Sequence, residues 1–176
     1  MIFTRTKLAG VVQVDLSSHG DERGFFARSW CAREFAAEGL NATTVQCNVS
    51  FNATKGTLRG MHYQDAPHPE AKLVRVTQGA IFDVAIDLRP DSPTFTQWVG
   101  TILSAENRRA LFVPEGCAHG FLTLADNSEV FYQMSEFYHP ELSRGVRYND
   151  PAFRIEWPGT IEVISERDNT YPGFKH

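Results

Sequence analysis

Residues 80–89 read AIFDVAIDLR, in which a large apolar side chain stands at every second position. A period of two is that of a β-strand, because successive side chains of a strand point to opposite faces of a sheet. The apolar set is Phe82, Val84, Ile86 and Leu88. We expect this set to pack on a core and the alternate, partly charged set to lie on the other face.

Similar short runs rich in β-branched and aromatic residues recur along the chain and are separated by turn residues. They span residues 11–14, 43–46, 58–64, 73–77, 96–103, 110–113, 120–123 and 129–135. Strands of this length and spacing predict an antiparallel sandwich or barrel. The clearest helical segment runs over residues 30–38, where Ser29 can cap the N-terminus and Gly39 can end the helix. Residues 165–176 lack periodicity and are expected to dock as a tail.

The length and composition predict a single globular domain over residues 1–176. Hydrophobic residues make up 42% and charged residues 22%, and no apolar run approaches the roughly 18 to 20 residues of a membrane helix. The first residues lack the continuous apolar core of a secretory signal, so we expect a cytoplasmic protein with no membrane partner.

The cysteines and the net charge exclude two further classes of protein. Cys31, Cys47 and Cys117 are odd in number, widely spaced and without a paired motif, which indicates reduced thiols and no zinc or redox site. The net charge is −4, which argues against a nucleic-acid partner because phosphate backbones bind basic surfaces. An anionic ligand would therefore have to be met by locally placed cationic groups.

Such groups stand in GTLRGMHYQ at residues 56–64 and in KLVRV at residues 72–76. These stretches place the cationic side chains of Arg59, His62 and Lys72 on neighbouring strands. Cations inside an apolar sheet cost stability unless they are paired, so this pattern indicates an anionic or ketonic ligand. A regular strand would put Arg59 and His62 on opposite faces, whereas a bulge at the strand's glycine could turn both inward.

Three other features are weaker when each is taken alone. Residues 113–121, VPEGCAHGF, form a turn that delivers His119 to the start of a strand, and Tyr132 stands in the middle of another strand. Residues 165–168, SERD, form a short charged run. Turn histidines, buried core tyrosines and solvated charges would also explain these patterns.

Together these segments resemble the dTDP-4-dehydrorhamnose 3,5-epimerases over nearly the entire chain. The matching segments are residues 21–26, 48–50, 55–64, 72–76, 87–89, 92–94 and 114–121, Tyr138, and residues 149–151 and 157–158. The resemblance implies a mainly β, cupin-type antiparallel jelly-roll barrel with a few short helices. It also implies a homodimer with the N-terminal strands in its interface, a nucleotide-sugar substrate, and no metal or other cofactor.

The resemblance also assigns chemistry to particular side chains. In a 4-keto sugar nucleotide the hydrogens on C3 and C5 lie next to a carbonyl, so removing either one gives an enolate that a cation can stabilise. By resemblance His62 is the base, Asp168 is its dyad partner, and Tyr132 is the acid on the opposite face. Lys72 matches a residue near the ketone oxygen, and Asp83 on the adjacent strand could hold it in place.

Substrate binding is assigned in the same way. The positions that match substrate contacts of the family are Arg23, Gln46, Asn48, Arg59 and His119. Arginine suits a diphosphate because its planar fork donates two hydrogen bonds at once.

Four presumed recognition positions depart from the family pattern. Arg28 and Ser143 stand where glutamate is common, Cys47 stands where aspartate is usual, and Arg167 replaces a lysine. The catalytic set matches throughout, so these departures bear on which nucleotide or sugar is recognised and leave the reaction type unchanged.

Other functions remain open from the sequence. A 3- or 5-epimerase or a 3,4-ketoisomerase could use the same fold on a related nucleotide sugar, although the residues follow the epimerase pattern. A metal-dependent cupin with His62, His68 and His119 as ligands is disfavoured because Tyr63 and Gln64 follow His62 in place of a second histidine. A non-catalytic sugar-binding jelly roll would need no acid and base across a sugar ring.

Overall fold

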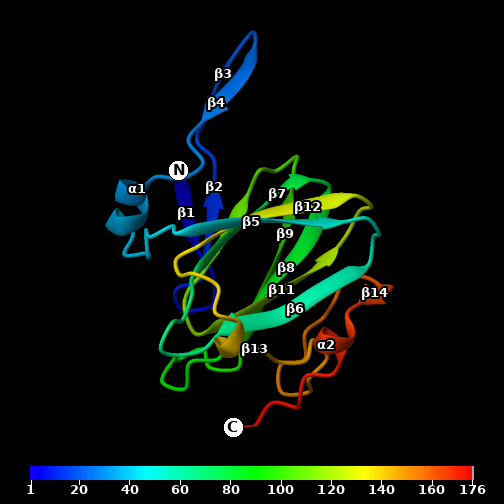
Figure 1. Cartoon of the computed structure of the whole chain (residues 1–176). Helices are drawn as coiled ribbons and strands as arrows, with labels where there is room; N and C mark the ends of the chain where they lie inside the picture. Colours follow the sequence, from blue (N-terminus) through cyan, green and yellow to red (C-terminus); the bar gives the residue numbers. More distant parts are fainter. Residues whose placement is uncertain (176) are drawn as a thin grey trace.

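A computed structural model describes residues 1–175 and shows two mainly antiparallel sheets that face each other (Figure 1). One sheet has the order β1 (Ile2–Arg5), β2 (Val12–Asp15), β10 (Ala110–Val113), β7 (Lys72–Gln78), β12 (Ser128–Met134), β5 (Gln46–Asn52). The other has the order β13 (Ser143–Gly145), β6 (Thr57–Gln64), β11 (Cys117–Thr123), β8 (Ala80–Asp87), β9 (Trp98–Ser104), and β14 (Val163–Ile164) pairs in parallel with β6. The expected jelly-roll type of fold is confirmed.

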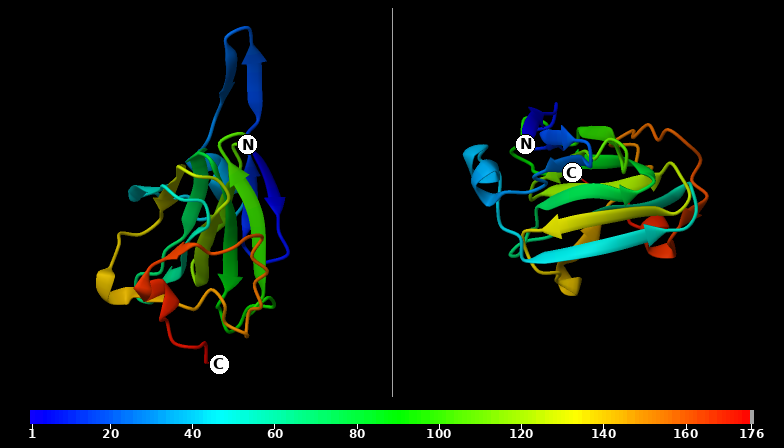
Figure 2. Two further views of the ribbon diagram at one scale, coloured as in Figure 1. Left: turned by 90° about the vertical axis from the view of Figure 1, so that its right-hand side faces the viewer. Right: turned by 90° about the horizontal axis from the view of Figure 1, so that it is seen from above.

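Short elements complete the chain. The helices are α1 (Ala32–Ala37), α2 (Glu166–Asn169) and the 3₁₀ turn η1 (Pro140–Leu142). The strands β3 (Ser18–Asp21) and β4 (Gly24–Ala27) form a separate hairpin that projects well beyond the two sheets (Figures 1 and 2). Among residues 1–175, the helices are all too short to cross a membrane.

The main core lies between the two sheets. Val74 and Val130 of the first sheet pack there with Ile81, Ala85 and Phe121 of the second. Burying such side chains stabilises the fold by roughly 1.5–3 kcal/mol for each large aliphatic or aromatic residue. The two sheets are therefore held together by their facing apolar sides, and polar side chains that point into the same space are sheltered from water.

The strand β8 differs from its expected half-buried state. Val84 and Ile86 lie in a second cluster, where Val146 and Phe153 of the C-terminal segment cover them. Asp83, on the alternate set, points to the interior and is fully buried. Both faces of β8 are buried because residues far along the chain fold back over its outer side.

Several expected boundaries need correction. Residues 43–45 are not a strand, since β5 begins at Gln46. Helix α1 has Cys31 and not Ser29 at its N-cap, and the Ser29 carbonyl instead accepts a hydrogen bond of 2.7 Å from Arg75. Gly39 ends the helix as expected, with a φ of +71° that suits glycine.

Residues 87–89 and 92–94, two of the segments that match the family, form a hydrogen-bonded cluster that anchors the loop after β8. The buried carboxylate of Asp87 accepts hydrogen bonds from Arg89, Ser92 and Thr94 at 2.5–2.8 Å. Burial alone would raise the pKa of Asp87, but these hydrogen bonds outweigh it and lower the pKa to about 2. Arg89 also binds the Ala9 carbonyl at 2.5 Å, so this ionised cluster ties the loop after β8 to the N-terminal segment.

Candidate active site

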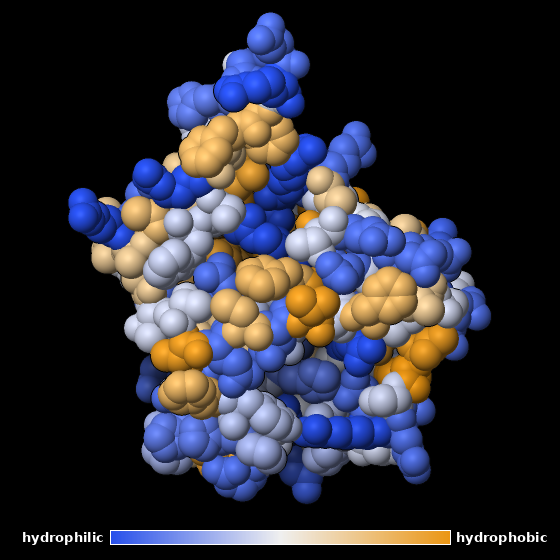
Figure 3. Space-filling model, turned by 45° about the horizontal axis from the view of Figure 1, so that its top comes forward, coloured by the Kyte–Doolittle hydropathy of each residue, from blue (hydrophilic) through white to orange (hydrophobic). Residues whose placement is uncertain are grey.

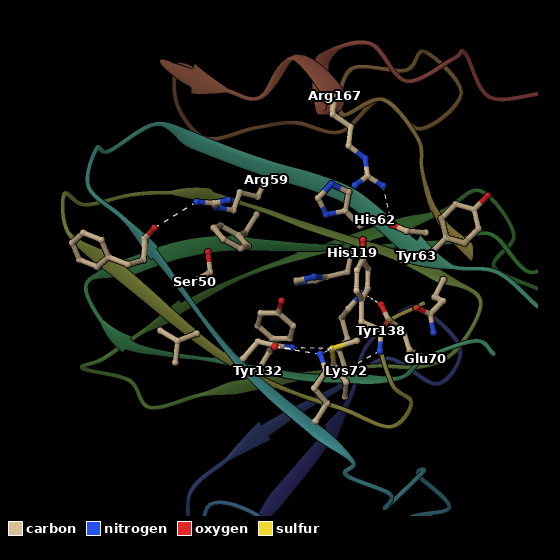
Figure 4. A pocket seen from close by; sticks show the side chains of 18 residues that line it. Ser50, Arg59, His62, Tyr63, Glu70, Lys72, His119, Tyr132, Tyr138 and Arg167 are labelled. Atoms are coloured by element: carbon tan, nitrogen blue, oxygen red, sulfur yellow. Dashed lines mark hydrogen bonds and ion pairs between the residues drawn. The ribbon is translucent and has the colours of Figure 1, made fainter. Parts of the chain in front are cut away.

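A cavity of about 530 Å³ opens between the two sheets (Figure 4). Side chains from β5, β6, β7, β11 and β12 line it, and Tyr138, Ser143 and Arg167 close one side. The wall carries five side chains with cationic or ionisable nitrogen groups, which are Arg59, His62, Lys72, His119 and Arg167.

A bulge in β6 brings both Arg59 and His62 to this cavity, as the sequence suggested. His62 pairs with His119 and Arg59 pairs with Phe121, so three residue steps on β6 oppose two on β11. Gly60 adopts a φ of +136°, and a Cβ there would lie 2.6 Å from the Gly120 Cα. Glycine is required at this crossing because the two backbones leave no space for a side chain.

His62 forms a dyad with Asp168 of α2. Its Nε2 lies 2.7 Å from Asp168 Oδ1, while Asp168 Oδ2 accepts the Gly60 N–H at 3.1 Å. Burial alone would raise the pKa of Asp168, but the hydrogen bond and charge of His62 and the Gly60 N–H lower it below the usual value. The carboxylate therefore stays ionised, and the imidazole Nδ1 is the nitrogen left to exchange a proton.

The Asp168 side chain is only 6% exposed, whereas the other three residues of the run 165–168 are exposed, so solvation does not explain Asp168. Ser165 caps α2 by accepting the Asp168 N–H at 3.1 Å, which fixes the turn that carries the carboxylate. The ring of Tyr171 packs edge-on against His62 with 6.1 Å between centroids. The C-terminal segment thus orients the imidazole from behind.

Tyr132 lies on β12 of the facing sheet, across the cavity from His62 (Figure 4). Burial, and after it the negative charge of Glu70, raises the pKa of the Tyr132 phenol, while Arg59 acts in the opposite direction. The phenol therefore remains protonated at neutral pH. The cavity holds a potential base on one sheet and a potential acid on the other.

Lys72 opens β7 and forms an ion pair with Glu70, which lies two residues before it. Asp83 does not hold Lys72, contrary to the expectation from the sequence. Instead, Asp83 Oδ1 lies 2.7 Å from His119 Nε2, because its strand β8 adjoins β11 in the opposite sheet. Asp83 is therefore the partner of His119.

Side chains of β5 that were predicted to bind substrate lie on different faces of the strand. Gln46 and Asn48 line it together with Ser50, and the alternation of the strand turns Cys47 to the outer face. Gln46 accepts the Tyr138 N–H at 3.2 Å. Cys47 thus lies outside the cavity of its own chain.

Arg167 and Ser143 meet at the cavity edge, where Arg167 Nη2 donates a hydrogen bond of 2.8 Å to Ser143 Oγ.

Arg23 and Arg28, which were predicted to bind substrate, do not line the cavity of their own chain. The Arg23 side chain is 84% exposed in the projecting hairpin and pairs with Asp21. Arg28 is 63% exposed and pairs with Glu34 at 2.7 Å.

Some lining residues had no role in the sequence-based prediction. Glu70 stands two positions before Lys72, a spacing that places both side chains on one face of an extended segment. Tyr138 matched the family pattern without an assigned role. Phe121 and Met134 belong to predicted strands, but their inward direction was not specified.

The three histidines of the metal-cupin alternative have separate partners. His62 binds Asp168 and His119 binds Asp83, whereas the His68 ring stacks on His139 with 4.3 Å between centroids. Their arrangement therefore does not converge on a common ligand position.

The family model of the dTDP-4-dehydrorhamnose 3,5-epimerases matches residues 5–176. The chain belongs to this family. The epimerase of Methanothermobacter thermautotrophicus is 44% identical over 172 residues, which cover 96% of this chain and 92% of that relative. As a member of this family, the chain is an enzyme of the isomerase class and an epimerase of a sugar nucleotide, so the non-catalytic alternative is set aside.

Two solved epimerase structures are similar over nearly the whole chain. That of Bacillus anthracis, with TDP and PPi bound, has a TM-score of 0.94 and 42% identity and covers 98% of this chain and 99% of its own. The dTDP-6-deoxy-D-glucose-3,5-epimerase of Legionella pneumophila, in complex with dTDP-4-keto-L-rhamnose, has a TM-score of 0.88 and 41% identity, with coverages of 95% and 89%.

Proposed function

We propose that this epimerase acts on dTDP-4-dehydro-6-deoxy-D-glucose and inverts C3 and C5 through proton transfer across the cavity. The observation that carries the proposal is the His62–Asp168 dyad on one sheet with Tyr132 facing it from the other. Inversion requires a base on one face of the sugar and an acid on the opposite face. The relative from Legionella pneumophila supports the substrate, since its structure holds dTDP-4-keto-L-rhamnose.

His62 Nδ1 removes the proton from the carbon next to the ketone, and the electron pair of the C–H bond moves onto the ketone oxygen. The Asp168 carboxylate stabilises the imidazolium that forms. The Lys72 ammonium offsets the negative charge that develops on the enolate oxygen. Tyr132 gives its proton to the opposite face, which restores the ketone. His62 then releases its proton to solvent and Tyr132 takes one up from solvent, after which the same sequence is repeated at the second carbon.

The nucleotide diphosphate is assigned to the remaining cationic groups. Arg59 is held by a 2.7 Å hydrogen bond from its Nε to Asn52, and its Nη2 donates to the Phe51 carbonyl at 3.5 Å. Its other terminal N–H groups are assigned to phosphate oxygens. Arg167 and Ser143 are in contact, so the two departures from the family pattern form a matched pair. An arginine–serine pair carries one positive charge, whereas a lysine–glutamate pair is neutral, and this charge suits a diphosphate.

The test of the proposal is proton NMR of dTDP-4-dehydro-6-deoxy-D-glucose in deuterated water with the purified enzyme. We expect solvent deuterium at both C3 and C5, together with the inverted product. Exchange at one carbon alone would identify a single-centre epimerase. Absence of exchange, with turnover of another nucleotide sugar, would reject the dTDP substrate.

We further propose a homodimer in which the projecting β3–β4 hairpin reaches a second copy. Phe26 is 76% exposed, and Val49 and Phe51 of β5, which also border the cavity, are 61% and 52% exposed. Figure 3 shows apolar side chains below the hairpin tip and on the body beneath it. Large apolar side chains that gather on the surface in this way are typical of a protein–protein interface. Binding roles for Arg23 and Arg28 depend on this arrangement, since neither lies at its own cavity.

Sedimentation equilibrium at micromolar concentration tests the dimer. We expect twice the chain mass of 19.8 kDa, and we expect Phe26→Asp to shift the protein to the monomer. A monomer mass for the unaltered protein would contradict the proposal.

For the cell compartment we propose the cytoplasm. This is a reducing environment, which agrees with Cys31, Cys47 and Cys117 being free thiols.

A further inference from the structure

Glu70 is a buried carboxylate in the cavity wall. Its side chain is 7% exposed, and Oε1 forms the ion pair with Lys72 Nζ. Oε2 is buried and has no hydrogen-bond partner among the described residues. A buried charge is costly unless it is paired, and Lys72 is the cation that pairs with the Glu70 carboxylate. Within residues 1–175, Glu70 is also the one carboxylate at ion-pair distance from Lys72.

We propose that Glu70 is a positioning residue, which holds the Lys72 ammonium in place beside the substrate ketone and acts on the reaction through Lys72 and Tyr132. This inference rests on the proposed function, in which Lys72 offsets the enolate charge. A lysine side chain is a flexible four-carbon stem, so its nitrogen is fixed only where a partner fixes it. An ammonium has three N–H donors, and the bond to Glu70 leaves two for the ketone oxygen.

The influence of Glu70 extends to the acid. Burial raises the pKa of Tyr132, and the negative charge of Glu70 raises it further. Arg59 lowers that pKa, Tyr138 raises it, and Lys72 and His119 line the same cavity. Glu70 therefore favours the protonated phenol that must give up a proton to the sugar.

The variant Glu70→Gln separates the charge from the shape, because glutamine has nearly the same size and keeps an oxygen that can accept from Lys72. We expect kcat to fall about tenfold or more with little change in KM, since the interaction strengthens only as the enolate forms. We also expect the alkaline limb of the pH profile to move to lower pH, because the phenol loses a neighbouring negative charge.

Two companion variants complete the kinetic test. Glu70→Asp keeps the charge but draws it away from Lys72, so kcat should fall while the alkaline limb stays nearer that of the unaltered enzyme. Glu106→Gln changes an exposed glutamate on the loop after β9 and should leave both unchanged. Equal kcat and pH profiles for Glu70→Gln and the unaltered enzyme would overturn the proposal.

A measurement without substrate keeps this test separate from that of the proposed function. Tyrosine labelled with ¹³C at Cζ reports phenol ionisation by NMR, and Tyr132→Phe identifies the Tyr132 signal. We expect this signal to titrate at lower pH in Glu70→Gln, whichever sugar the enzyme accepts. An unchanged titration in a variant with the same circular dichroism spectrum would overturn the role of Glu70, whereas an inactive unaltered enzyme would bear only on the substrate.

Discussion

Replacing His62 with alanine is expected to lower proton exchange at both C3 and C5 by a factor of about 10² to 10⁴. The variant removes the imidazole that Asp168 orients at the cavity and leaves a carboxylate that is only 6% exposed. Deuterium incorporation, measured by NMR at saturating substrate, reports each carbon separately. KM should change less than kcat, because the imidazole acts mainly in the transition state.

The matched control is His68→Ala, which removes an imidazole whose ring lies against His139 and outside the dyad. This control should exchange both carbons at the rate of the unaltered enzyme. If His62→Ala kept exchange at one carbon, that carbon would have a different base. The candidate would then be His119, which lines the same cavity and is paired with the buried Asp83.

Periodicity and turn residues predicted the central strands, whereas the family resemblance assigned the site residues. The strands β6, β7, β8, β10, β11 and β12 lie within a few residues of their expected bounds, since β-branched and aromatic runs between turn residues give a clear signal. The bulge that turns Arg59 and His62 to one cavity followed from Gly60. These features depend on neighbouring residues in the chain, which is why the sequence reveals them.

Local pattern could not show features that depend on contacts between distant segments. The resemblance named Asp168 as the partner of His62, which stands 106 residues away, but its burial results from the C-terminal segment folding against β6. The same segment buries the outer face of β8, which local alternation predicted to be half exposed. The hairpin β3–β4 is exposed over nearly its whole length, so its sequence lacks the alternation of apolar and polar residues that predicts a strand.

Local sequence pattern also could not predict which buried charged residues pair with each other. The sequence offered Asp83 as a residue that could hold Lys72, and it gave Glu70 no role. The sheet order decides otherwise, since β8 lies beside β11 and delivers Asp83 to His119. Only the topology shows that Lys72 and Asp83 belong to opposite sheets.

Replacing Tyr132 with phenylalanine is expected to separate exchange from inversion. In this variant His62 can still remove a proton, trade it for solvent deuterium and return it to the same face of the sugar. Inversion needs a donor on the opposite face, and the phenylalanine ring has none. We therefore expect the inverted product to form about 10² to 10⁴ times more slowly, while deuterium still enters with the configuration retained.

One NMR time course measures both quantities, because the ring couplings report configuration and the loss of signal reports exchange. Tyr148→Phe, which removes a phenol outside the cavity lining, is the control and should match the unaltered enzyme. Equal loss of exchange and inversion in Tyr132→Phe would mean that the phenol serves substrate binding or enolate formation. Retention of both exchange and inversion would mean that another residue is the acid. Loss of inversion alone would require that His62 on one sheet serves one face of the sugar and Tyr132 on the other sheet serves the opposite face.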